Sequence, residues 1–356
     1  MEPSSEILEA AGGWPGLISR LLAGDDLGGA LAGAAVAEIL AGEVAPSRIA
    51  AFLVGLRAKG ETAGELSGML DAVMDDAVHV ALPDDVLETA VDIVGTGGDR
   101  SHSINVSTMA ALVTAGAGVP VCKHGNRAAS SSCGTADVLE ALGVRIELTA
   151  DGVATCVEEA GFGFCFAPAF HPAFRHAGPI RRELGVPTAF NLLGPMANPA
   201  GVRRQLIGVA DPGVAEVMVA ALAARGSTHA WVVHGGGLDE LSTTGPSTVA
   251  ELRSGAVSSM VVDPSELGLS LVDASSLVGG SPAVNADVVR RVLAGEPGPH
   301  RDIVVLNAAA ALVVADRAAD LAEGLALAAE SIDSGRAAAV LDRLVIVSGR
   351  VGSGDA

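Results

Sequence analysis

The feature that most constrains the fold is a change of pattern near residue 88. From there on, short runs rich in Val, Ile and Phe alternate with helix-like segments. The apolar runs cover residues 89–94, 118–122, 162–167, 205–210, 229–234 and 257–262. Strands that alternate with helices are typical of a largely parallel sheet covered by helices. The sequence therefore predicts an α/β domain.

The segment before this change has a different character. Residues 16–80 repeat apolar side chains at helical spacing and carry no strand signal. Gly42 is placed to end one helix and Pro46 to begin the next, while residues 81–87 read as a connector. We expect a small N-terminal helical domain over residues 1–85 and a large α/β domain over 86–356. In the latter, helices surround a central, mostly parallel sheet.

Composition excludes several classes of protein. The mean hydropathy is +0.45, yet residues 27–42 are interrupted by Glu38 and residues 303–315 by Asn307, so neither forms a membrane span. A net charge of −20 and 3% aromatic residues argue against nucleic acid as a partner. The first residues lack a basic segment followed by an apolar one, which predicts a cytoplasmic protein.

Two candidate binding segments follow the first apolar run. Ligands of parallel sheets bind beyond the carboxyl ends of strands, and Gly95 to Asp99 comes directly after residues 89–94. Glycines there let backbone N–H groups approach an anion closely, although an ordinary tight turn has the same composition. Ser103 to Thr108 then brings hydroxyl and amide groups to an expected helix start. They suit either helix capping or a phosphate or magnesium site.

The segment Lys123 to Ser131 follows the second apolar run. Only two of the 22 basic residues are lysines, Lys59 and Lys123. A lysine kept at a strand end beside Gly, Asn, Arg and Ser has the composition of an anion-binding loop. A solvated basic loop is the alternative. His124 has no assignable carboxylate partner, so we expect it to position groups rather than to act as a base.

Two later segments complete the candidates. Asp239 and Glu240 follow the glycines 235–237 after the run 229–234. One or two carboxylates together with substrate phosphates are the usual ligands of Mg²⁺, although a solvated acidic turn looks the same. Arg181, in a segment that precedes residues 190–199, suits a small carboxylate or a surface pair.

Taken together and in this order, these segments resemble the anthranilate phosphoribosyltransferase family over nearly the whole chain. The resemblance implies transfer of the phosphoribosyl group from phosphoribosyl pyrophosphate to anthranilate in tryptophan biosynthesis, with release of pyrophosphate. It also implies Mg²⁺, two ions per subunit, and a homodimer. A helical insertion near residues 170–200 is expected to pack on the helical domain.

The resemblance assigns roles residue by residue. Lys123, Asp239 and Glu240 match catalytic positions, and Ser107, Asp239 and Glu240 match the magnesium positions. Gly95, Asn126 and Arg181 match residues that contact anthranilate. The implied phosphoribosyl pyrophosphate site comprises Gly95, Gly98, Asp99, Ser103, Asn105, Val106, Ser107, Thr108, Lys123, His124, Gly125, Asn126, Arg127, Ala128, Ala129, Ser130, Ser131 and Thr135.

The sequence departs from the family pattern in a few places. Thr135 stands where serine is usual, and Ser132-Cys133 replaces a pair that usually carries a charge. The glycines 235–237 form an unusually glycine-rich loop. None of these changes removes a required group.

Two other functions stay open at this stage. One is a pyrimidine nucleoside phosphorylase-like enzyme, and the other is a non-catalytic relative that binds a ligand or nucleic acid. The homodimer is expected to form through the helical domain, where Leu17, Leu21 and Val36 provide either the contact face or the core of the domain itself.

Overall fold

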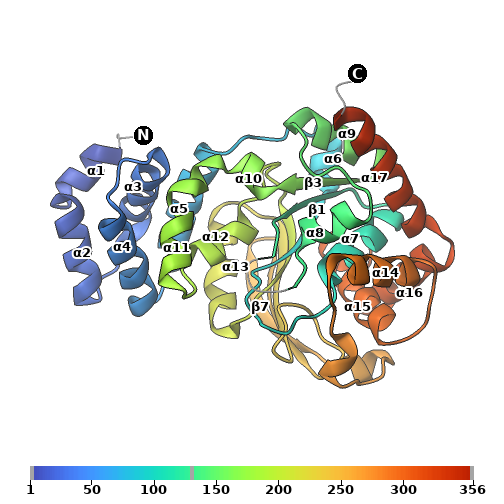
Figure 1. The fold of residues 1–356 in the computed structure, drawn as a ribbon. Coiled ribbons are helices and arrows are strands. Elements are labelled where there is room, and N and C mark those ends of the chain that lie inside the picture. The colour runs from blue at the N-terminus through green and yellow to red at the C-terminus, as the bar shows by residue number, and fades with distance from the viewer. Residues whose placement is uncertain (1–3, 129–131, 353–356) are drawn as a thin grey trace.

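The computed structural model describes residues 4–128 and 132–352, with a helical unit at one end of an α/β body (Figure 1). The helical unit consists of α1 (Ser4–Ala10), α2 (Gly13–Ala23), α3 (Gly28–Ala41), α4 (Pro46–Lys59) and α5 (Ala63–Asp75). As predicted, α3 ends at Gly42, whose φ is 78°, and Pro46 opens α4. The expectation of a helical domain followed by an α/β domain is confirmed.

Leu17, Leu21 and Val36 lie inside this helical unit. Their side chains are at most 4% exposed in the single chain. They are therefore part of the unit's own core, and the suggestion that they form a dimer face is wrong. Leu22 is 81% exposed on α2.

The described residues of the α/β body form a seven-stranded sheet in the order β3-β2-β1-β4-β5-β6-β7. The strands are β1 (Val91–Gly95), β2 (Val121–Gly125), β3 (Phe162–Phe166), β4 (Arg204–Gly208), β5 (His229–Gly235), β6 (Ser247–Arg253) and β7 (Ala256–Val262). The first five strands in this order pair in parallel. β6 pairs antiparallel with β5, and β7 pairs antiparallel with β6. The predicted mostly parallel sheet is confirmed.

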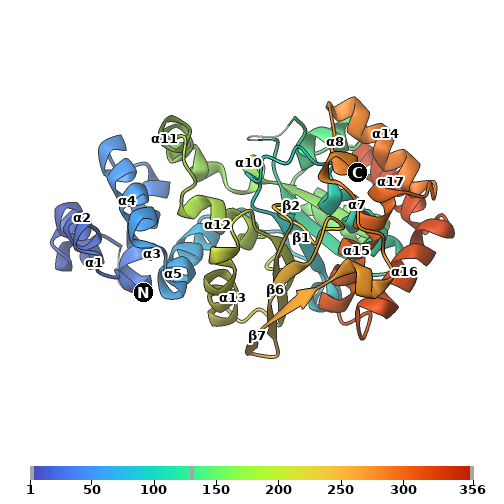
Figure 2. The ribbon, with the colours of Figure 1, turned by 90° about the horizontal axis from the view of Figure 1, so that it is seen from below.

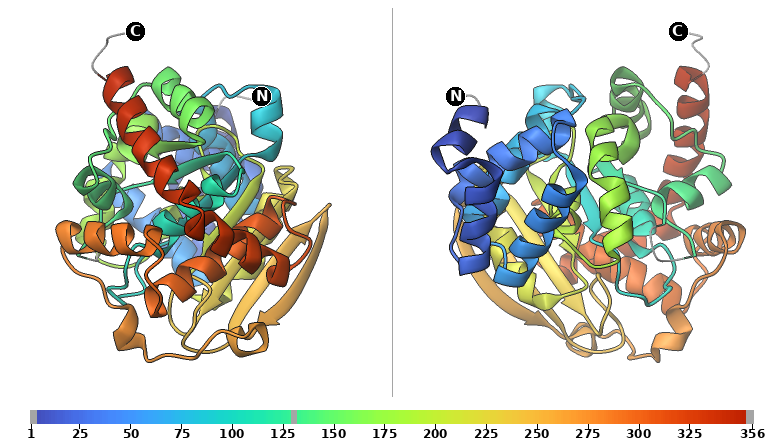
Figure 3. Two further views of the ribbon diagram at one scale, coloured as in Figure 1. Left: turned by 90° about the vertical axis from the view of Figure 1, so that its right-hand side faces the viewer. Right: turned by 60° about the vertical axis from the view of Figure 1, so that its left-hand side comes forward.

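Helices cover both faces of the sheet (Figures 2 and 3). The helices after β1 are α7 (Val106–Gly116), α8 (Thr135–Ala141), α9 (Ala150–Ala160), α10 (Ala167–Phe170), α11 (Gly178–Leu184), α12 (Ala189–Met196), α13 (Ala215–Ala224), α14 (Pro282–Leu293), α15 (Pro299–Val314), α16 (Leu321–Asp333) and α17 (Arg336–Gly352), and α6 (Asp84–Thr89) precedes it. Short 3₁₀ turns span Pro172–His176, Pro212–Val214, Pro264–Leu267 and Ala274–Leu277. α11 and α12 pack against α4 and α5 of the helical unit.

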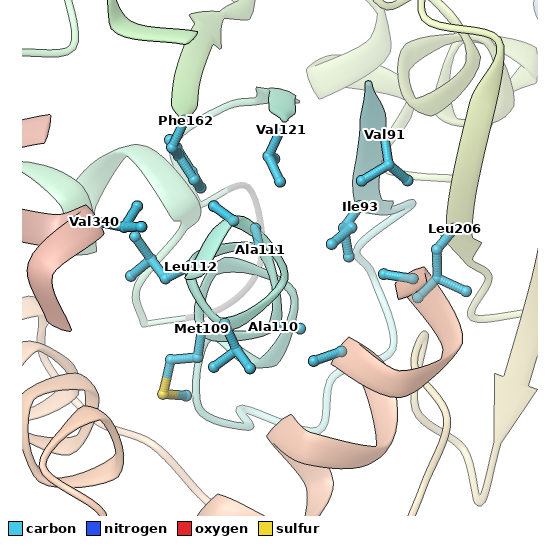
Figure 4. Packing of buried hydrophobic residues seen from close by; sticks show 14 of the residues in the cluster. Val91, Ile93, Met109, Ala110, Ala111, Leu112, Val121, Phe162, Leu206 and Val340 are labelled. Carbon is cyan, nitrogen blue, oxygen red and sulfur yellow. The ribbon is translucent and has the colours of Figure 1, made fainter. Parts of the chain in front are cut away.

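α7 lies at the centre of one core, as Figure 4 shows. Its residues Met109 to Leu112 are fully buried, and Ile93 of β1, Phe162 of β3 and Val340 of α17 lie around the helix, with Val340 beside Leu112. Two of these four residues are alanines, which let the helix approach the sheet closely. Because Ser107 lies in the first turn of α7, this packing fixes the position of Ser107 and its neighbours.

A second core joins the helical unit to the other face of the sheet. It contains Leu66 and Met69 of α5 together with Met218 of α13 and Ile207 of β4. None of the helices in the described part of the chain is long and apolar enough to cross a membrane.

Candidate active site

The acidic pair Asp239-Glu240 lies against the loop that follows β1. The Gly97 N–H donates to Asp239 Oδ2 at 2.7 Å, and the Ser107 N–H donates to Glu240 Oε1 at 3.1 Å. Segments more than 130 residues apart in the sequence thus meet at the carboxyl ends of β1 and β5, where ligands of parallel sheets bind.

Two glycines make this approach possible. A Cβ at Gly95 would overlap the Asp239 carboxylate, and a Cβ at Gly208 would overlap the Asp239 carbonyl oxygen. Gly97 and Gly98 have φ values of 65° and 83°, which strongly favour glycine. The glycine-rich sequence after β1 is therefore required by the close contact with Asp239 as well as by the turn.

Lys123 extends from β2 beneath the start of α7. Its side chain is 1% exposed, and its Nζ donates to the Ile93 carbonyl and to Ser107 Oγ, the latter at 3.3 Å. Burial lowers the pKa of Lys123, while the carboxylates of Asp92, Glu240 and Asp239 oppose this shift. The Lys123 amine thus lies between the acidic pair and β1, where the neighbouring carboxylates favour its charged form and burial opposes it.

The two acidic side chains are crowded with negative charge. Burial raises the pKa of Asp239 to about 6, and the nearby Asp99 carboxyl adds to the shift. Burial and the Asp239 charge raise the pKa of Glu240 well above its usual value. A bound cation would relieve this repulsion. Among the described residues no group of three or more His, Cys, Asp or Glu side chains could hold a metal ion.

Asn105, Thr108 and Thr135 join the loops after β1 and β2. Asn105 Nδ2 donates to the Cys133 carbonyl at 3.1 Å, and its Oδ1 accepts from Asn285 Nδ2 at 2.8 Å. Thr108 Oγ1 lies 3.4 Å from Thr135 Oγ1. The Asn105 side chain makes no capping hydrogen bond to α7, so its amide ties loops together instead.

The loop Gly95 to Val106 is stabilised partly by its own side chains. Asp99 accepts from the Ser101 hydroxyl at 2.7 Å, and Ser101 Oγ accepts from the Ser103 N–H at 3.2 Å. Ser103 also pairs with Val278 in an isolated bridge. Val106 is buried at the start of α7.

Arg127 is turned toward α8. Its guanidinium pairs with Asp137 at 3.1 Å and with Glu140 at 2.5 Å, and it lies over the Phe166 ring. These carboxylates raise the pKa of Arg127. Asp137 also accepts from the N–H groups of Ala128 and Gly134, which shapes the loop after β2. Ala129, Ser130 and Ser131 lie outside the described residues.

His124 occupies a neutral, buried position. Its Nδ1 lies 3.1 Å from the Gly194 carbonyl oxygen, which requires Nδ1 to be the donor. Burial lowers its pKa to about 3. The backbone N–H of His124 donates to Asp92 Oδ1 at 3.1 Å, and Asn198 Nδ2 donates to Asp92 Oδ2 at 2.8 Å. Burial raises the pKa of Asp92 to about 6.

Arg181 and Asn126 lie on different elements. Arg181, on α11, is partly buried, donates to Asn191 Oδ1 at 3.3 Å and lies over the Phe190 ring. Asn126 is exposed just after β2, beside Gly125. Among the described side-chain hydrogen bonds, that of Arg181 goes to α12 and that of Asn126 to the next residue of its own loop.

Sequence reasoning missed Asp92, Asn198, Asn285 and Asn307. Asp92 had a visible signal, since an acidic residue inside an apolar strand must find buried donors. The three asparagines had none, because their partners are backbone groups or side chains far away in the sequence.

Comparison with known proteins places these features in context. The chain matches the model of the glycosyl transferase family, a/b domain, over residues 87–338 and that of the family's helical bundle domain over 15–77. It is 54% identical over 340 residues to the anthranilate phosphoribosyltransferase of Salinispora arenicola, covering 94% of this chain and 96% of that protein. The corresponding protein of Chloroflexus aggregans is 51% identical, with 93% and 97% covered.

Solved structures agree. The crystal structure of anthranilate phosphoribosyltransferase from Thermus thermophilus superposes with a TM-score of 0.88 at 43% identity, covering 94% of this chain and 99% of that one. The Saccharomyces cerevisiae enzyme in complex with phosphoribosyl pyrophosphate and Mg gives 0.86 at 29% identity, covering 96% and 99%.

Proposed function

The chain belongs to the anthranilate phosphoribosyltransferase family, and from this premise we propose how its own residues carry out the family's reaction. The chain is a glycosyltransferase of tryptophan biosynthesis. It transfers the phosphoribosyl group of phosphoribosyl pyrophosphate to the amine of anthranilate and releases pyrophosphate. The observation that carries the proposal is the meeting of Lys123, Asp239 and Glu240 at the glycine loop after β1.

The leaving group sets the main chemical demand. As the bond between ribose C1 and the pyrophosphate oxygen breaks, negative charge grows on pyrophosphate. In our proposal Lys123 faces this charge from β2, and the N–H groups of Gly98 and Asp99 in the glycine loop bind phosphate oxygens. The N–H groups of Gly97 and Ser107 hold the acidic pair instead. The remaining groups of the phosphoribosyl pyrophosphate site, Ser103, Asn105 and residues 123–131 with Thr135, orient the ribose and its phosphates.

Magnesium fits the donor set of this site. Asp239 and Glu240 place two carboxylates side by side near Asp99, and burial together with this like charge raises the pKa of both carboxyls. When bound, Mg²⁺ supplies charge neutralisation of the departing pyrophosphate. We propose two ions per subunit, held by Asp239, Glu240 and the Ser107 hydroxyl together with substrate oxygens.

Anthranilate needs positioning more than activation. Its aromatic amine is a weak base that is unprotonated near neutral pH, so the attack requires no strong general base. We propose that Arg181 pairs with the anthranilate carboxylate and that Asn126 and Gly95 contact the same substrate. Neutral His124 donates a hydrogen bond to the Gly194 carbonyl and does not accept a proton from the substrate.

Several broader features belong to the same proposal. We propose a cytoplasmic homodimer with a helical domain over residues 1–85, a catalytic domain over 86–356 and a packed insertion near 170–200. The nucleoside phosphorylase-like alternative and the non-catalytic alternative lose support, because relatives at about 50% identity are phosphoribosyltransferases and the acidic pair is intact.

The direct test is the loss of anthranilate fluorescence when purified protein is mixed with anthranilate, phosphoribosyl pyrophosphate and Mg²⁺. We expect decay that stops with a chelator and in the Asp239→Asn/Glu240→Gln variant. No decay with folded protein would refute the substrate assignment, and uridine or thymidine with phosphate would then test the phosphorylase alternative.

A further inference from the structure

Asn307 lies in the middle of α15, and its side chain is 0% exposed. It is remote in sequence from every segment assigned to the site, yet it contacts the residue that follows the acidic pair. We infer that Asn307 is a positioning residue that holds Asp239 and Glu240 in place through the backbone of Leu241. This inference rests on the proposed role of the acidic pair.

The contact is a two-way clamp. Asn307 Nδ2 donates to the Leu241 carbonyl at 2.8 Å, and Asn307 Oδ1 accepts from the Leu241 N–H at 3.0 Å. The second Nδ2 proton goes to the Ile303 carbonyl at 2.9 Å. Every polar atom of the amide is therefore used, and only a side chain with a donor and an acceptor at this length satisfies both backbone groups of Leu241.

The clamp completes the support of the loop between β5 and β6. On one side of the acidic pair, Gly235 and Leu238 exchange backbone hydrogen bonds of 3.2 and 2.9 Å. On the other side, the Ser242 N–H donates to Ser247 Oγ at 3.0 Å. Asn307 fixes the residue between these points, so the backbone of Asp239 and Glu240 is held at both ends.

The acidic pair needs such support. Each carboxylate accepts one backbone hydrogen bond from the loop after β1, Asp239 from Gly97 and Glu240 from Ser107, so a movement of the neighbouring backbone at Leu241 would break these contacts. α15 resists this movement because it is anchored in the core, where it packs on α7 and α16. The free energy of holding the carboxylates in place is then supplied by folding rather than by the arriving cation.

The test uses Asn307→Ala and Asn307→Leu, the second of which keeps most of the side-chain volume. Ser331→Ala is the matched control: Ser331 is also fully buried, and its hydroxyl donates to the Val113 carbonyl at 2.7 Å, in the second half of α7, rather than to the loop of the acidic pair. Two quantities are measured in each full-length variant. One is the Mg²⁺ concentration that gives half-maximal rate, compared with the KM for anthranilate. The other is Mn²⁺ binding in the presence of phosphoribosyl pyrophosphate, followed by electron paramagnetic resonance.

We expect both Asn307 variants to need about tenfold more Mg²⁺ and to bind Mn²⁺ about tenfold more weakly, with the KM for anthranilate nearly unchanged and Ser331→Ala like the wild type. Unchanged metal dependence, or equal losses in all three variants, would overturn the inference. A wild-type protein that binds Mn²⁺ but consumes no anthranilate would refute the proposed function alone, and the Mn²⁺ comparison would still decide the role of Asn307.

Discussion

The acidic residues of this site are held in positions that suit cation binding but lower the stability of the folded chain. Asp239 and Glu240 are pressed against Gly95, Gly97 and Ser107, where burial and mutual repulsion oppose their ionised forms. A folded chain without a cation therefore holds these carboxylates at a cost in free energy. The same arrangement places the carboxylates where a cation and pyrophosphate would bind, so binding of the cation would offset this cost.

Asp239→Asn tests that cost. The pKa of Asp239 is raised from 3.8 to about 6, so the folded state binds its proton more tightly than the unfolded state, and the penalty is present above about pH 6 and absent below about pH 4. Because the carboxylate is partly open to water, we expect Asp239→Asn to gain about 1 kcal/mol in free energy of unfolding at pH 8.

The measurement is urea unfolding with a chelator present, at pH 8 and at pH 4.5, for both proteins. The gain of the variant should shrink at the lower pH, while its activity is lost at every pH. A variant that is less stable than the wild type at pH 8, by the same amount as at pH 4.5, would contradict the expectation.

His124 gives a second prediction at this scale. Its pKa is lowered to about 3 by burial, so the imidazole is neutral throughout the range in which the enzyme works and cannot exchange a proton near pH 7. We therefore expect His124→Ala to leave the shape of the rate–pH profile unchanged, because an inflection near pH 6 would come from Asp239. His124→Ala should lose less than about tenfold in kcat, and Asp239→Asn/Glu240→Gln more than about a hundredfold. Comparable losses in the two variants would show that His124 takes part in the chemistry.

Site residues could be predicted from the sequence where they form short motifs of consecutive residues near a strand. Gly95 to Asp99 lies at the end of β1, and Asp239-Glu240 lies in the loop that follows β5, as predicted. Lys123 lies inside β2 rather than after it, and the structure brings the three segments together. Arg127 is the instructive exception, because its partners Asp137 and Glu140 on α8 become visible only in three dimensions.

At the scale of elements, strand prediction followed apolar content. The six predicted runs correspond to strands, whereas β6 was missed because its sequence includes Ser247, Thr248, Glu251 and Arg253. β6 is held by antiparallel pairing with β5 and β7, and this tertiary contact outweighs its weak local signal. Helix ends were easier to predict, since Gly42 and Pro46 act through their own backbone geometry.

The pairing of α3 with α5 depends on glycine. A Cβ at Gly68 would overlap the Gly29 backbone, whereas a Cβ at Gly64, on the same helix, meets nothing within 4 Å. We expect Gly68→Ala to push the helices apart and lower the free energy of unfolding by about 1 to 3 kcal/mol. Gly64→Ala, the matched control, should be neutral or stabilise by up to about 1 kcal/mol. Urea unfolding of both variants measures the difference, and equal effects would show that the close packing is not required.

At the scale of the whole molecule, the boundary near residue 85 separates two patterns in the sequence, but one of the two hydrophobic cores extends across it. Leu66 and Met69 of α5 share a buried cluster with Met218 of α13 and Ile207 of the sheet. The α11 and α12 helices, from the α/β part of the chain, pack on α4 and α5. Periodicity in the sequence reveals each amphipathic element but not which faces meet, so this shared core was not predictable.

The shared core has a thermodynamic consequence for the complete chain. If the helical unit unfolded first, it would expose the apolar face of α13 and one face of the sheet, and the hydrophobic stabilisation of both parts would be lost together. We therefore expect a single calorimetric transition. Leu17→Ala, which removes a fully buried side chain in α2 at a cost of about 2 to 5 kcal/mol, should move that whole transition to lower temperature. An early transition that is confined to the size of the helical unit, with a second one left at the wild-type temperature, would show that the two parts are energetically independent.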